Sequence, residues 1–506
     1  MLIFLCAFAI MLLRKNIGRG NMPYLTVKNG ECESVIEFFG TPILRDVLVE
    51  NGFAVISPCG GKGVCGKCAV DVSGDITPPD EREIELNTRL SCRTRLLGDA
   101  VVELKSDEYI FDEATNAKAF VNKNGWTGLG VAIDIGTTTV ELRLFDSDGV
   151  LLSEAQSVNP QRSVSGDVIG RIDAAINGKG KELRDMIVSC IDGLAERVCN
   201  DASCQKSDIE RAIIAGNTAM LYLLTNRNPE AISHYPFEAD ELFGIWVNEN
   251  TYLTPCMNAY VGGDITCALL ASGICESDTT TLLCDIGTNG EMALWKNGSL
   301  FVTSAAAGPA FEGAEISCGC QNVLGAVNRV TVDNSKIIGE TVGNVKAIGI
   351  NGTGLIDAFA SFLELGFIDN TGYASAPLII NTSNGSIELT QDDIRALQLA
   401  KAAIRAGVET LIESTDTKID EIDELLIAGS FGSNLSIPSA VRIGLIPKEL
   451  ENKTKCIGNA SLGGAAEMLF DEAKMKKAEN IAKCAKHIQL GGSEEFYDRF
   501  IKAIDF

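Results

Sequence analysis

Four cysteines near the N-terminus have the types and spacing of an iron–sulfur ligand set. Cys59, Cys65 and Cys68 follow a C-x5-C-x2-C pattern, and Cys92 comes after a further 23 residues. Glycines let a loop backbone fold closely around a cluster and point N–H groups at its sulfurs. The loop contains four of them: Gly60, Gly61, Gly63 and Gly66. Because a [2Fe–2S] cluster requires four thiolates, we predict that the four cysteines bind one.

Two other roles for these cysteines stay open. The loop is one residue longer than the plant-type ferredoxin spacing of C-x4-C-x2-C. A structural zinc site usually shows two pairs of closely spaced ligands, whereas Cys92 stands alone. Cysteines can also be buried core residues, which is the role we expect for the other thirteen of the chain's 17.

A second set of candidate residues lies in two matched loops. Asp-Ile-Gly-Thr begins at Asp134 and again at Asp285, 151 residues later. Each Asp ends an apolar run typical of a buried strand, and each Gly-Thr begins a turn into a second strand. The two carboxylates can hold a hydrated Mg²⁺, and the turns can donate hydrogen bonds to phosphate oxygens. The loop residues predicted to bind ATP are Gly136, Thr137, Thr138, Thr139, Gly287, Thr288, Asn289 and Gly290.

A third part of the predicted ATP site follows a buried-strand pattern at residues 425–428. Gly429, Ser430 and Gly432 would let the backbone pack against an adenosine. Hydrolysis also needs a residue that positions water.

Three candidates for that residue are chosen by their positions alone. They are Asp264, Asn217 and Glu291. Their alternative roles are, in that order, a helix cap, a turn and a solvated strand end.

The elements that must position the cysteines suggest a β-grasp ferredoxin domain over residues 22–105. Strand patterns occur at 24–27, around Val70 and Val72, and at 101–104. Thr41 and Pro42 predict a helix with a Thr N-cap and Pro at its first position, and Gly52 predicts its end.

The rest of the chain divides into a linker and two matched halves. We expect a charged linker at 106–126 and ATPase halves at 127–278 and 279–506, because the repeated hairpin indicates an internal duplication. Thr390 and Asp393 predict a capping box at the start of a long amphipathic helix.

The first 21 residues carry a separate expectation. The apolar run Met1–Leu13 is too short to span a bilayer and lacks the positive start of a signal peptide. We expect Met22 to be the biological start, which makes residues 1–21 a gene-model extension. A membrane-surface tether is the alternative.

Composition limits the function further. The chain has 43 Lys+Arg and 68 Asp+Glu, a formal net charge of −25, and no basic cluster that could bind nucleic acid. Two histidines, His234 and His487, are too few for a three-histidine zinc site. Many cysteines in a long chain are unlike a small disulfide scaffold, so we expect a reducing, cytoplasmic location.

The arrangement of the two hairpins resembles the actin, hexokinase and heat-shock ATPase superfamily. Strands followed by glycines at 213–216 and 425–429, and glycines before expected helices at 262–263 and 463–464, complete that pattern. The resemblance implies an α/β fold with two ribonuclease-H-like halves that close on ATP.

A ferredoxin fused to such an ATPase resembles the reductive activators of corrinoid proteins from anaerobes. Five segments look like that family's signatures: 159–161, 166–172, 305–313, 389–395 and 399–407. The second departs from the family, which usually carries an Ala between Gly166 and Asp167. The chain is also shorter than the longer members, which leaves partner choice open.

The resemblance implies a reaction and its participants. The expected activity is ATP-dependent, one-electron reduction of a corrinoid protein from Co(II) to Co(I), with a [2Fe–2S] cluster, ATP and Mg²⁺ as cofactors. The partners would be a corrinoid protein of a methyltransferase system and an upstream low-potential electron donor. Nucleic acid and a stable membrane association are not expected, and a homodimer stays open.

Three rival functions fit parts of the same pattern. A small-molecule kinase with a redox-sensing ferredoxin would use the two hairpins for phosphoryl transfer. A redox adaptor would bind ATP without turnover. An activator of another low-potential enzyme, such as a dehydratase, would usually lack the fused ferredoxin.

Overall fold

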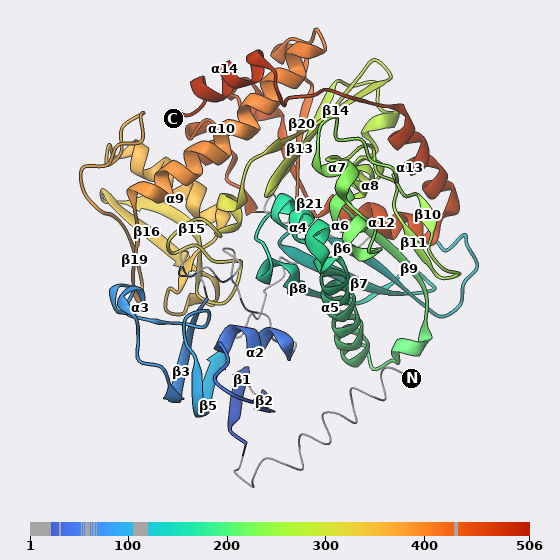
Figure 1. Ribbon diagram of the computed structural model, residues 1–506. Helices are drawn as coiled ribbons and strands as arrows, with labels where there is room; N and C mark the ends of the chain where they lie inside the picture. Colours follow the sequence, from blue (N-terminus) through green and yellow to red (C-terminus); the bar gives the residue numbers. More distant parts are fainter. Residues whose placement is uncertain are drawn as a thin grey trace. The chain divides into compact units, whose positions relative to one another are not determined.

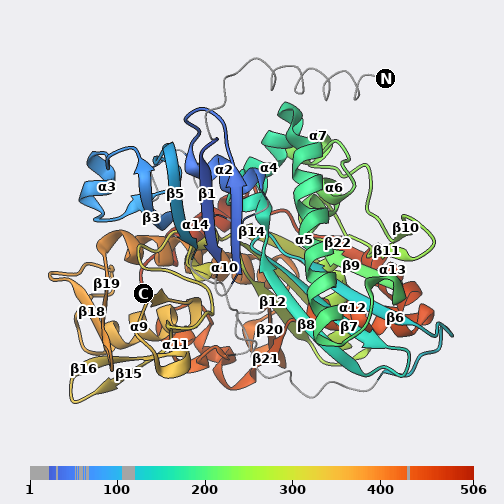
Figure 2. The same ribbon diagram turned by 90° about the horizontal axis from the view of Figure 1, so that it is seen from below.

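The protein was analysed as a computed structural model, which describes residues 22–29, 32–51, 53, 55, 61, 63, 66, 68–104, 120–429 and 434–506. The chain divides into two compact units, Met1–Ser106 and Asp107–Phe506, whose elements are labelled in Figures 1 and 2. No described helix combines the length and apolar character needed to cross a membrane. Several expected features lie outside the described residues: 1–21, the linker up to 119, Gly52, Cys59, Gly60, Cys65, Ser430 and Gly432.

The first unit has the β-grasp fold that was expected. Its five-stranded sheet has the order β2-β1-β5-β3-β4, with β1 antiparallel to β2 and parallel to β5. Helix α2 packs its Leu44, Val47 and Leu48 into one core with Leu25 and Val27 of β1. The elements are β1 (Tyr24–Asn29), β2 (Cys32–Glu37), α2 (Leu44–Glu50), β3 (Ala69–Ile76), α3 (Glu81–Glu85), β4 (Arg89–Leu90) and β5 (Leu96–Leu104).

The predicted start of α2 is wrong by two residues. The helix begins at Leu44, its N-cap residue is Ile43, and no side chain caps it, so residues 41–42 lie outside it. Ile43 is extended because it forms an isolated bridge with Arg95. The Leu44 N–H donates to the Thr94 carbonyl at 2.9 Å, so a tertiary contact takes the place of the expected cap.

The second unit contains two sheets of the same topology. In each, three consecutive antiparallel strands are followed by two parallel strands beside the first, in the orders β11-β9-β6-β7-β8 and β21-β20-β12-β13-β14. This repeated order is the ribonuclease-H-like arrangement, so the expected duplicated fold is confirmed. Strand β10 extends the first sheet beside β11, and β22 extends the second sheet beside β14.

The strand bounds of both sheets are as follows. The first sheet contains β6 (Leu129–Ile135), β7 (Thr139–Asp146), β8 (Leu151–Val158), β9 (Ile209–Gly216), β10 (Ile245–Trp246) and β11 (Thr251–Leu253). The second contains β12 (Thr281–Ile286), β13 (Asn289–Lys296), β14 (Ser299–Ala306), β20 (Glu424–Ala428), β21 (Thr454–Gly458) and β22 (Ala485–His487). A third, five-stranded sheet contains β15 (Ala326–Asp333), β16 (Lys336–Thr341), β17 (Gly349–Ile350), β18 (Leu378–Thr382) and β19 (Gly385–Leu389).

Helices of the second unit cover both six-stranded sheets and join them. Helices α5 and α6 pack on the first sheet, and α9 and α10 contribute to the core of the second (Figure 1). Helices α8 and α12 share one core with Ala132 of the first sheet and Leu283 of the second. The helices are α4 (Val168–Ala174), α5 (Gly180–Asp201), α6 (Thr218–Leu224), α7 (Glu230–Ser233), α8 (Gly263–Ser272), α9 (Gly352–Glu364), α10 (Gln391–Ser414), α11 (Ile437–Arg442), α12 (Ala460–Phe470), α13 (Glu472–Cys484) and α14 (Glu494–Lys502).

Residues 120–126, at the end of the expected linker, pack on α12. The ring of Phe120 stacks on Phe470 with 5.1 Å between centroids. The Trp126 indole N–H donates to the Leu469 carbonyl at 3.1 Å. These contacts anchor the start of the second unit to a helix more than 300 residues later.

Candidate functional site

The two hairpins of the second unit place an acidic pair at the same position. Asp134 on β6 lies directly opposite Glu141 on β7, and Asp285 on β12 lies directly opposite Glu291 on β13. Residues opposite each other on antiparallel strands have neighbouring side chains. Each half therefore presents an Asp–Glu pair where its first strand ends, and Glu141 is a member that the sequence analysis missed.

The parallel neighbour strands complete the floor of the site. Asp134 pairs with Ala215 of β9, and Asp285 pairs with Ala428 of β20, so the segments after both strands lie beside the carboxylates. Gly429 has a φ of +94°, and a Cβ there would lie 2.6 Å from Asp285 Oδ1. A glycine at this position is therefore required by both the backbone conformation and the close approach.

These segments enclose a cavity of about 120 Å³ between the two halves of the second unit. Almost all described residues of the predicted ATP site line it; Gly290 is not among its lining residues. The cavity also contacts four residues that were not predicted: Glu141, Ile286, Glu312 and Asn459. It is smaller than the roughly 300–1,000 Å³ of typical ligand pockets.

Six carboxylates line this cavity and form what we call the acidic cluster; Glu291 is buried and the other five are half-buried. Its members are Asp134, Glu141, Asp264, Asp285, Glu291 and Glu312. Burial raises the pKa of all six, to about 7 for Glu141 and Asp285 and to about 8 for Asp264, and repulsion among the carboxylates adds to the rise for several of them.

The charge of the cavity determines which ligands it can take. No Lys or Arg is among its lining residues in the described part of the chain. A bare polyphosphate would be repelled, whereas a phosphate ligand carrying a divalent cation would not. Among the described residues no three His, Cys, Asp or Glu side chains are grouped to hold a metal by themselves. The cluster thus fits a hydrated cation such as Mg²⁺ that completes its shell with water and phosphate oxygens.

Residues at the start of α12 fix the first acidic pair. The Asn459 amide donates to Asp134 Oδ2 at 3.2 Å and to Glu141 Oε2 at 2.9 Å. The Ser461 hydroxyl donates to Asp134 Oδ1 at 2.9 Å. The orientation of Asp134 therefore depends on a segment more than 300 residues away.

Glu312 connects the two predicted phosphate loops. Its Oε2 accepts hydrogen bonds from the hydroxyls of Thr138, in the first loop, and Thr288, in the second. Its Oε1 accepts from the Thr288 backbone N–H at 3.0 Å. Glu312 lies in the 305–313 segment, which was recognised as a signature but not as part of the site.

Asn217 is a helix cap, not the turn residue proposed as its alternative role. It is the N-cap of α6, and its Oδ1 accepts from the Met220 N–H at 3.0 Å. Its Nδ2 donates to the Thr137 hydroxyl at 3.2 Å. Both ends of the amide are therefore engaged in holding the first loop.

The other two hydrolytic candidates are carboxylates of the acidic cluster. Asp264 lies in the first turn of α8, whose N-cap is Gly262, so it is not the cap of that helix. One of its oxygens accepts from the Ile265 N–H at 2.8 Å. Glu291 is buried on β13, so a solvated strand end is the wrong description of it.

In the first unit, the two described cysteines of the predicted ligand set come together. Cys68 Sγ lies 3.2 Å from Cys92 Sγ, and the hydrogen bond between the two sulfurs lowers the pKa of the Cys68 thiol to about 6. Gly61, Gly63 and Gly66 have φ of +82°, +74° and +70°, which glycine adopts without strain. Paired thiols beside a glycine-rich turn fit the ligand set of an iron–sulfur cluster.

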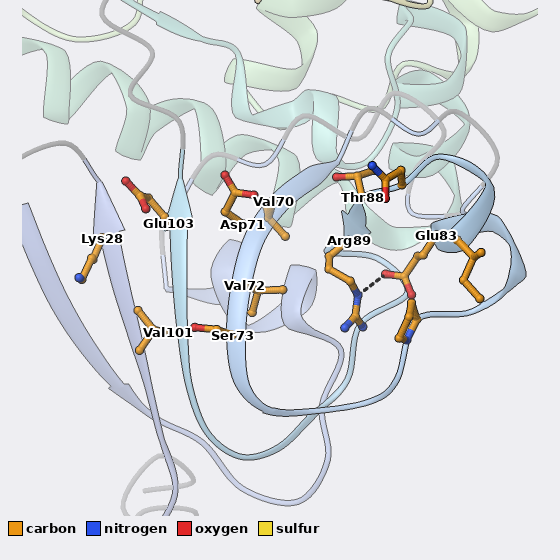
Figure 3. A pocket seen from close by; sticks show the side chains of 13 residues that line it. Lys28, Val70, Asp71, Val72, Ser73, Glu83, Thr88, Arg89, Val101 and Glu103 are labelled. Carbon is orange, nitrogen blue, oxygen red and sulfur yellow. Dashed lines mark hydrogen bonds and ion pairs between the residues drawn. The ribbon is translucent and has the colours of Figure 1, made fainter.

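A hollow of about 670 Å³ also opens on the first unit, beside β3, β5 and α3 (Figure 3). Lys28, Asp71 and Glu103 line it, and Arg89 forms an ion pair with Glu83 at 3.1 Å within it. Neither Cys68 nor Cys92, the two described cysteines of the predicted ligand set, is among its lining residues. Its charges are of both signs and include the Arg89–Glu83 ion pair, so the acidic cavity is the stronger candidate site.

Comparison with known proteins gives matches along most of the chain. Residues 29–97 match the 2Fe-2S iron-sulfur cluster binding domain. Residues 129–277 match the RACo middle region, and residues 279–506 match the C-terminal domain of RACo, the ASKHA domain.

Two curated relatives share these regions. The corrinoid activation enzyme RamQ of Eubacterium limosum is 34% identical over 378 residues, which are 66% of this chain and 63% of that protein. The chain thus spans less than two thirds of that relative. The [Co(II) methylated amine-specific corrinoid protein] reductase of Methanosarcina barkeri is 26% identical over 389 residues, which are 68% of this chain and 71% of that protein.

A solved structure of a reductive activator for corrinoid, iron-sulfur protein has a similar fold. It is 27% identical, with a TM-score of 0.71, and the match covers 95% of this chain and 98% of that one. Together with the sheet topology, these matches confirm the expected fold class of a ferredoxin-like domain and an actin/hexokinase-like ATPase fold.

Proposed function

Because this chain belongs to the family defined by the RACo middle region and C-terminal domain, we propose that it is an ATP-dependent reductive activator of a corrinoid protein. It would return the cobalt of its partner from Co(II) to Co(I) by one electron. One observation carries the proposal: the chain joins a fold that pairs two thiols at a glycine-rich turn to a fold whose cavity has six carboxylates and no basic side chain among its described lining residues.

The acidic cavity is the proposed ATP site. Loops 136–139 and 287–290 would donate to the phosphates, and Gly429, Ser430 and Gly432 would lie against the adenosine. Asp134 and Asp285 would hold Mg²⁺, which when bound neutralises phosphate charge. Asn459 and Ser461 support this role for Asp134, because they fix its carboxylate while leaving it ionisable.

Asp264 is the proposed water-positioning residue. Asn217 uses both ends of its amide to hold α6 and the first loop. The Oδ1 of Asp264 accepts a hydrogen bond from the Ile265 N–H of the same helix. Its side chain lines the cavity, so the other carboxylate oxygen stays available to a water there. Glu291 stays the second candidate, since it also lines the cavity.

Cys59, Cys65, Cys68 and Cys92 are the proposed cluster ligands. A [2Fe–2S] cluster, when bound, supplies a one-electron carrier with a potential of about −400 mV in plant-type ferredoxins. The protein's own part is to hold four thiolates and shield them with a close glycine-rich backbone. The proposed domain limits are 22–105 for this part and 127–278 and 279–506 for the two ATPase halves.

The need for ATP follows from the energetics of the proposed reaction. Reducing a cobalt whose potential lies below that of the donor is uphill by about 2.3 kcal/mol for each 100 mV. When ATP binds one arrangement of the two ATPase halves more tightly than another, it shifts the equilibrium between the two arrangements. The free energy of this shift is set by the difference in ATP affinity. The partners are a corrinoid protein of a methyltransferase system and an upstream low-potential electron donor.

ATP turnover with and without the partner tests this proposal. Hydrolysis should rise at least tenfold when the Co(II) form of the corrinoid protein is added and should need Mg²⁺. Turnover that depends instead on a small hydroxylated substrate would favour the kinase. Tight Mg-ATP binding with no turnover, even with the partner, would favour the redox adaptor.

A further inference from the structure

Glu312 binds the groups that were predicted to bind phosphate. A carboxylate with three hydrogen-bond donors, one of them a backbone N–H, is bound much as a phosphate oxygen would be. Two donors come from Thr288 and one from Thr138. Phosphates cannot use these donors while Glu312 holds them, so a nucleotide in this cavity must displace its carboxylate.

Arg162 is a buried cation whose charge acts on this carboxylate and whose Nε lacks a hydrogen-bond partner. Its side chain is 3% exposed, and its buried Nε has no hydrogen-bond partner. The structure shows no ion pair between Arg162 and Glu312 within 4.0 Å among the described residues, yet the positive charge of Arg162 lowers the pKa of Glu312 against the larger effect of burial. Burying part of a charged group without a partner lowers the stability of the fold. We therefore expect the Arg162 guanidinium to pair with an anion in some state of the protein.

The chain places Arg162 beside the first loop. It lies in the short 3₁₀ helix Pro160–Ser163, directly after Asn159. The Asn159 amide donates to the Gly136 carbonyl at 2.8 Å, which fixes this helix against the loop. Arg162 is thus held near the site while the Nε of its guanidinium has no hydrogen-bond partner.

A second buried arginine nearby, Arg171, does have hydrogen-bond partners. Arg171 donates from Nη2 to the Thr137 carbonyl at 2.6 Å and from Nε to the Ser165 carbonyl at 3.0 Å. Those bonds hold the first loop in place and use the Nε and Nη2 of its guanidinium. The charges of both arginines lower the pKa of Glu312, but only Arg162 has an Nε without a hydrogen-bond partner, which leaves it available to an anion.

We propose that Glu312 is a displaceable substitute for a nucleotide phosphate. Without nucleotide it fastens the two loops together; when phosphates take its donors, it moves to Arg162 and forms an ion pair there. Glu312 and Arg162 are then positioning residues that set the affinity for Mg-ATP. This inference rests on the proposed ATP site and adds a mechanism for its closing and opening.

A double-mutant cycle on Mg-ATP affinity tests the movement, with calorimetry on the full chain. In the structure the Glu312 carboxylate bonds to the two loops and not to Arg162, so it competes with phosphate for the loop donors. Removing its charge in Glu312→Gln weakens this competition and should tighten Mg-ATP binding about tenfold. Arg162→Gln should weaken binding about tenfold, because the displaced carboxylate loses its partner. In the Glu312→Gln background the same Arg162 change should have no effect.

The control is Glu315→Gln, which removes the same charge three residues later from a side chain that bonds to neither loop among the described contacts. It should change affinity less than threefold. An equal loss from Arg162→Gln in both backgrounds would mean that Arg162 contacts phosphate directly and would overturn the movement. Equal tightening by Glu315→Gln and Glu312→Gln would reduce the effect to general charge and would also overturn it.

Hydrogen exchange without nucleotide separates this inference from the proposed function. The Thr288 amide donates to Glu312, so exchange over residues 287–290 should rise at least fivefold in Glu312→Gln and stay unchanged in Glu315→Gln. No rise in Glu312→Gln would overturn the loop contact whether or not ATP binds. Failure of the wild-type protein to bind Mg-ATP would overturn the proposed ATP site, and the displacement with it.

Discussion

At the scale of single residues, the acidic cluster brings six carboxylates to one cavity. None of the described lining residues is basic, and burial and mutual repulsion raise the pKa of Asp285 and Glu291. Natural sites of this kind are strained without their ligand, and removing a charge relieves the strain.

Asp285→Asn should separate the role of this carboxylate as a Mg²⁺ ligand from its repulsion within the acidic cluster. The substitution keeps the shape but removes a proposed Mg²⁺ ligand and one charge of the cluster. We expect the kcat for ATP hydrolysis to fall at least 100-fold, while the Tm without nucleotide stays equal or rises by a few degrees. Assays of turnover and thermal unfolding measure both quantities. The control is Asp278→Asn at an exposed position, which should alter neither. A lower Tm with normal turnover would contradict a ligand role for Asp285.

Asp264→Asn tests the proposed water-positioning role. The amide keeps an acceptor for the Ile265 N–H but cannot take up a proton from water. We expect kcat to fall at least 100-fold with KM for Mg-ATP within threefold. Asn217→Ala should instead raise KM, because it releases the Thr137 hydroxyl of the first loop. The reverse pattern in the two variants would exchange their roles.

At the scale of elements, the N-terminus of α10 depends on one buried carboxylate. Asp393 accepts from the Ser317 N–H and hydroxyl, both at 2.6 Å, and from the Thr390 N–H at 2.8 Å. It therefore joins the helix start to the chain that follows Glu312. The predicted capping box of Thr390 and Asp393 is confirmed, and the bonds to Ser317 add a tertiary role.

Asp393→Ala should destabilise the second unit by roughly 2–4 kcal/mol, because it leaves several buried donors unsatisfied. Urea unfolding followed by circular dichroism measures the shift. The matched control is Asp392→Ala, one residue earlier and exposed, for which we expect a loss below about 1 kcal/mol. Equal losses in the two variants would mean that the bonds to Ser317 contribute nothing net.

Elements with strong local patterns were predictable from the sequence. The hairpin strands, the strand before Gly429 and the long helix α10 have apolar periodicities that local physics determines. The start of α2 was not, because its backbone is held by a bridge to Arg95 from a distant segment.

The candidate site was predictable in part. Both loops and both Asp residues follow from the repeated tetrad. Glu141 could have been found as well, since an acidic residue follows each tetrad: Glu141 after Asp134 and Glu291 after Asp285. Glu312 could not have been placed by spacing alone, because its contacts join segments 24 and 174 residues apart.

At the scale of the whole molecule, the chain consists of two compact units with separate proposed cofactors. Cys92→Ser should therefore abolish the visible absorbance of the [2Fe–2S] cluster while Mg-ATP affinity changes less than twofold. Absorbance spectra and calorimetry measure the two properties. Cys484→Ser, at an exposed cysteine outside the predicted ligand set, should leave both unchanged. An intact cluster spectrum in Cys92→Ser would remove Cys92 from the ligand set.

The most direct test of the central claim is the appearance of Co(I), followed by visible absorbance under anoxic conditions. Chemically reduced protein is mixed with a corrinoid protein in its Co(II) form, with and without Mg-ATP. The proposed function predicts Co(I) only when Mg-ATP is present, and none with Asp285→Asn or Cys92→Ser. Co(I) forming at the same rate without nucleotide would contradict ATP-dependent activation.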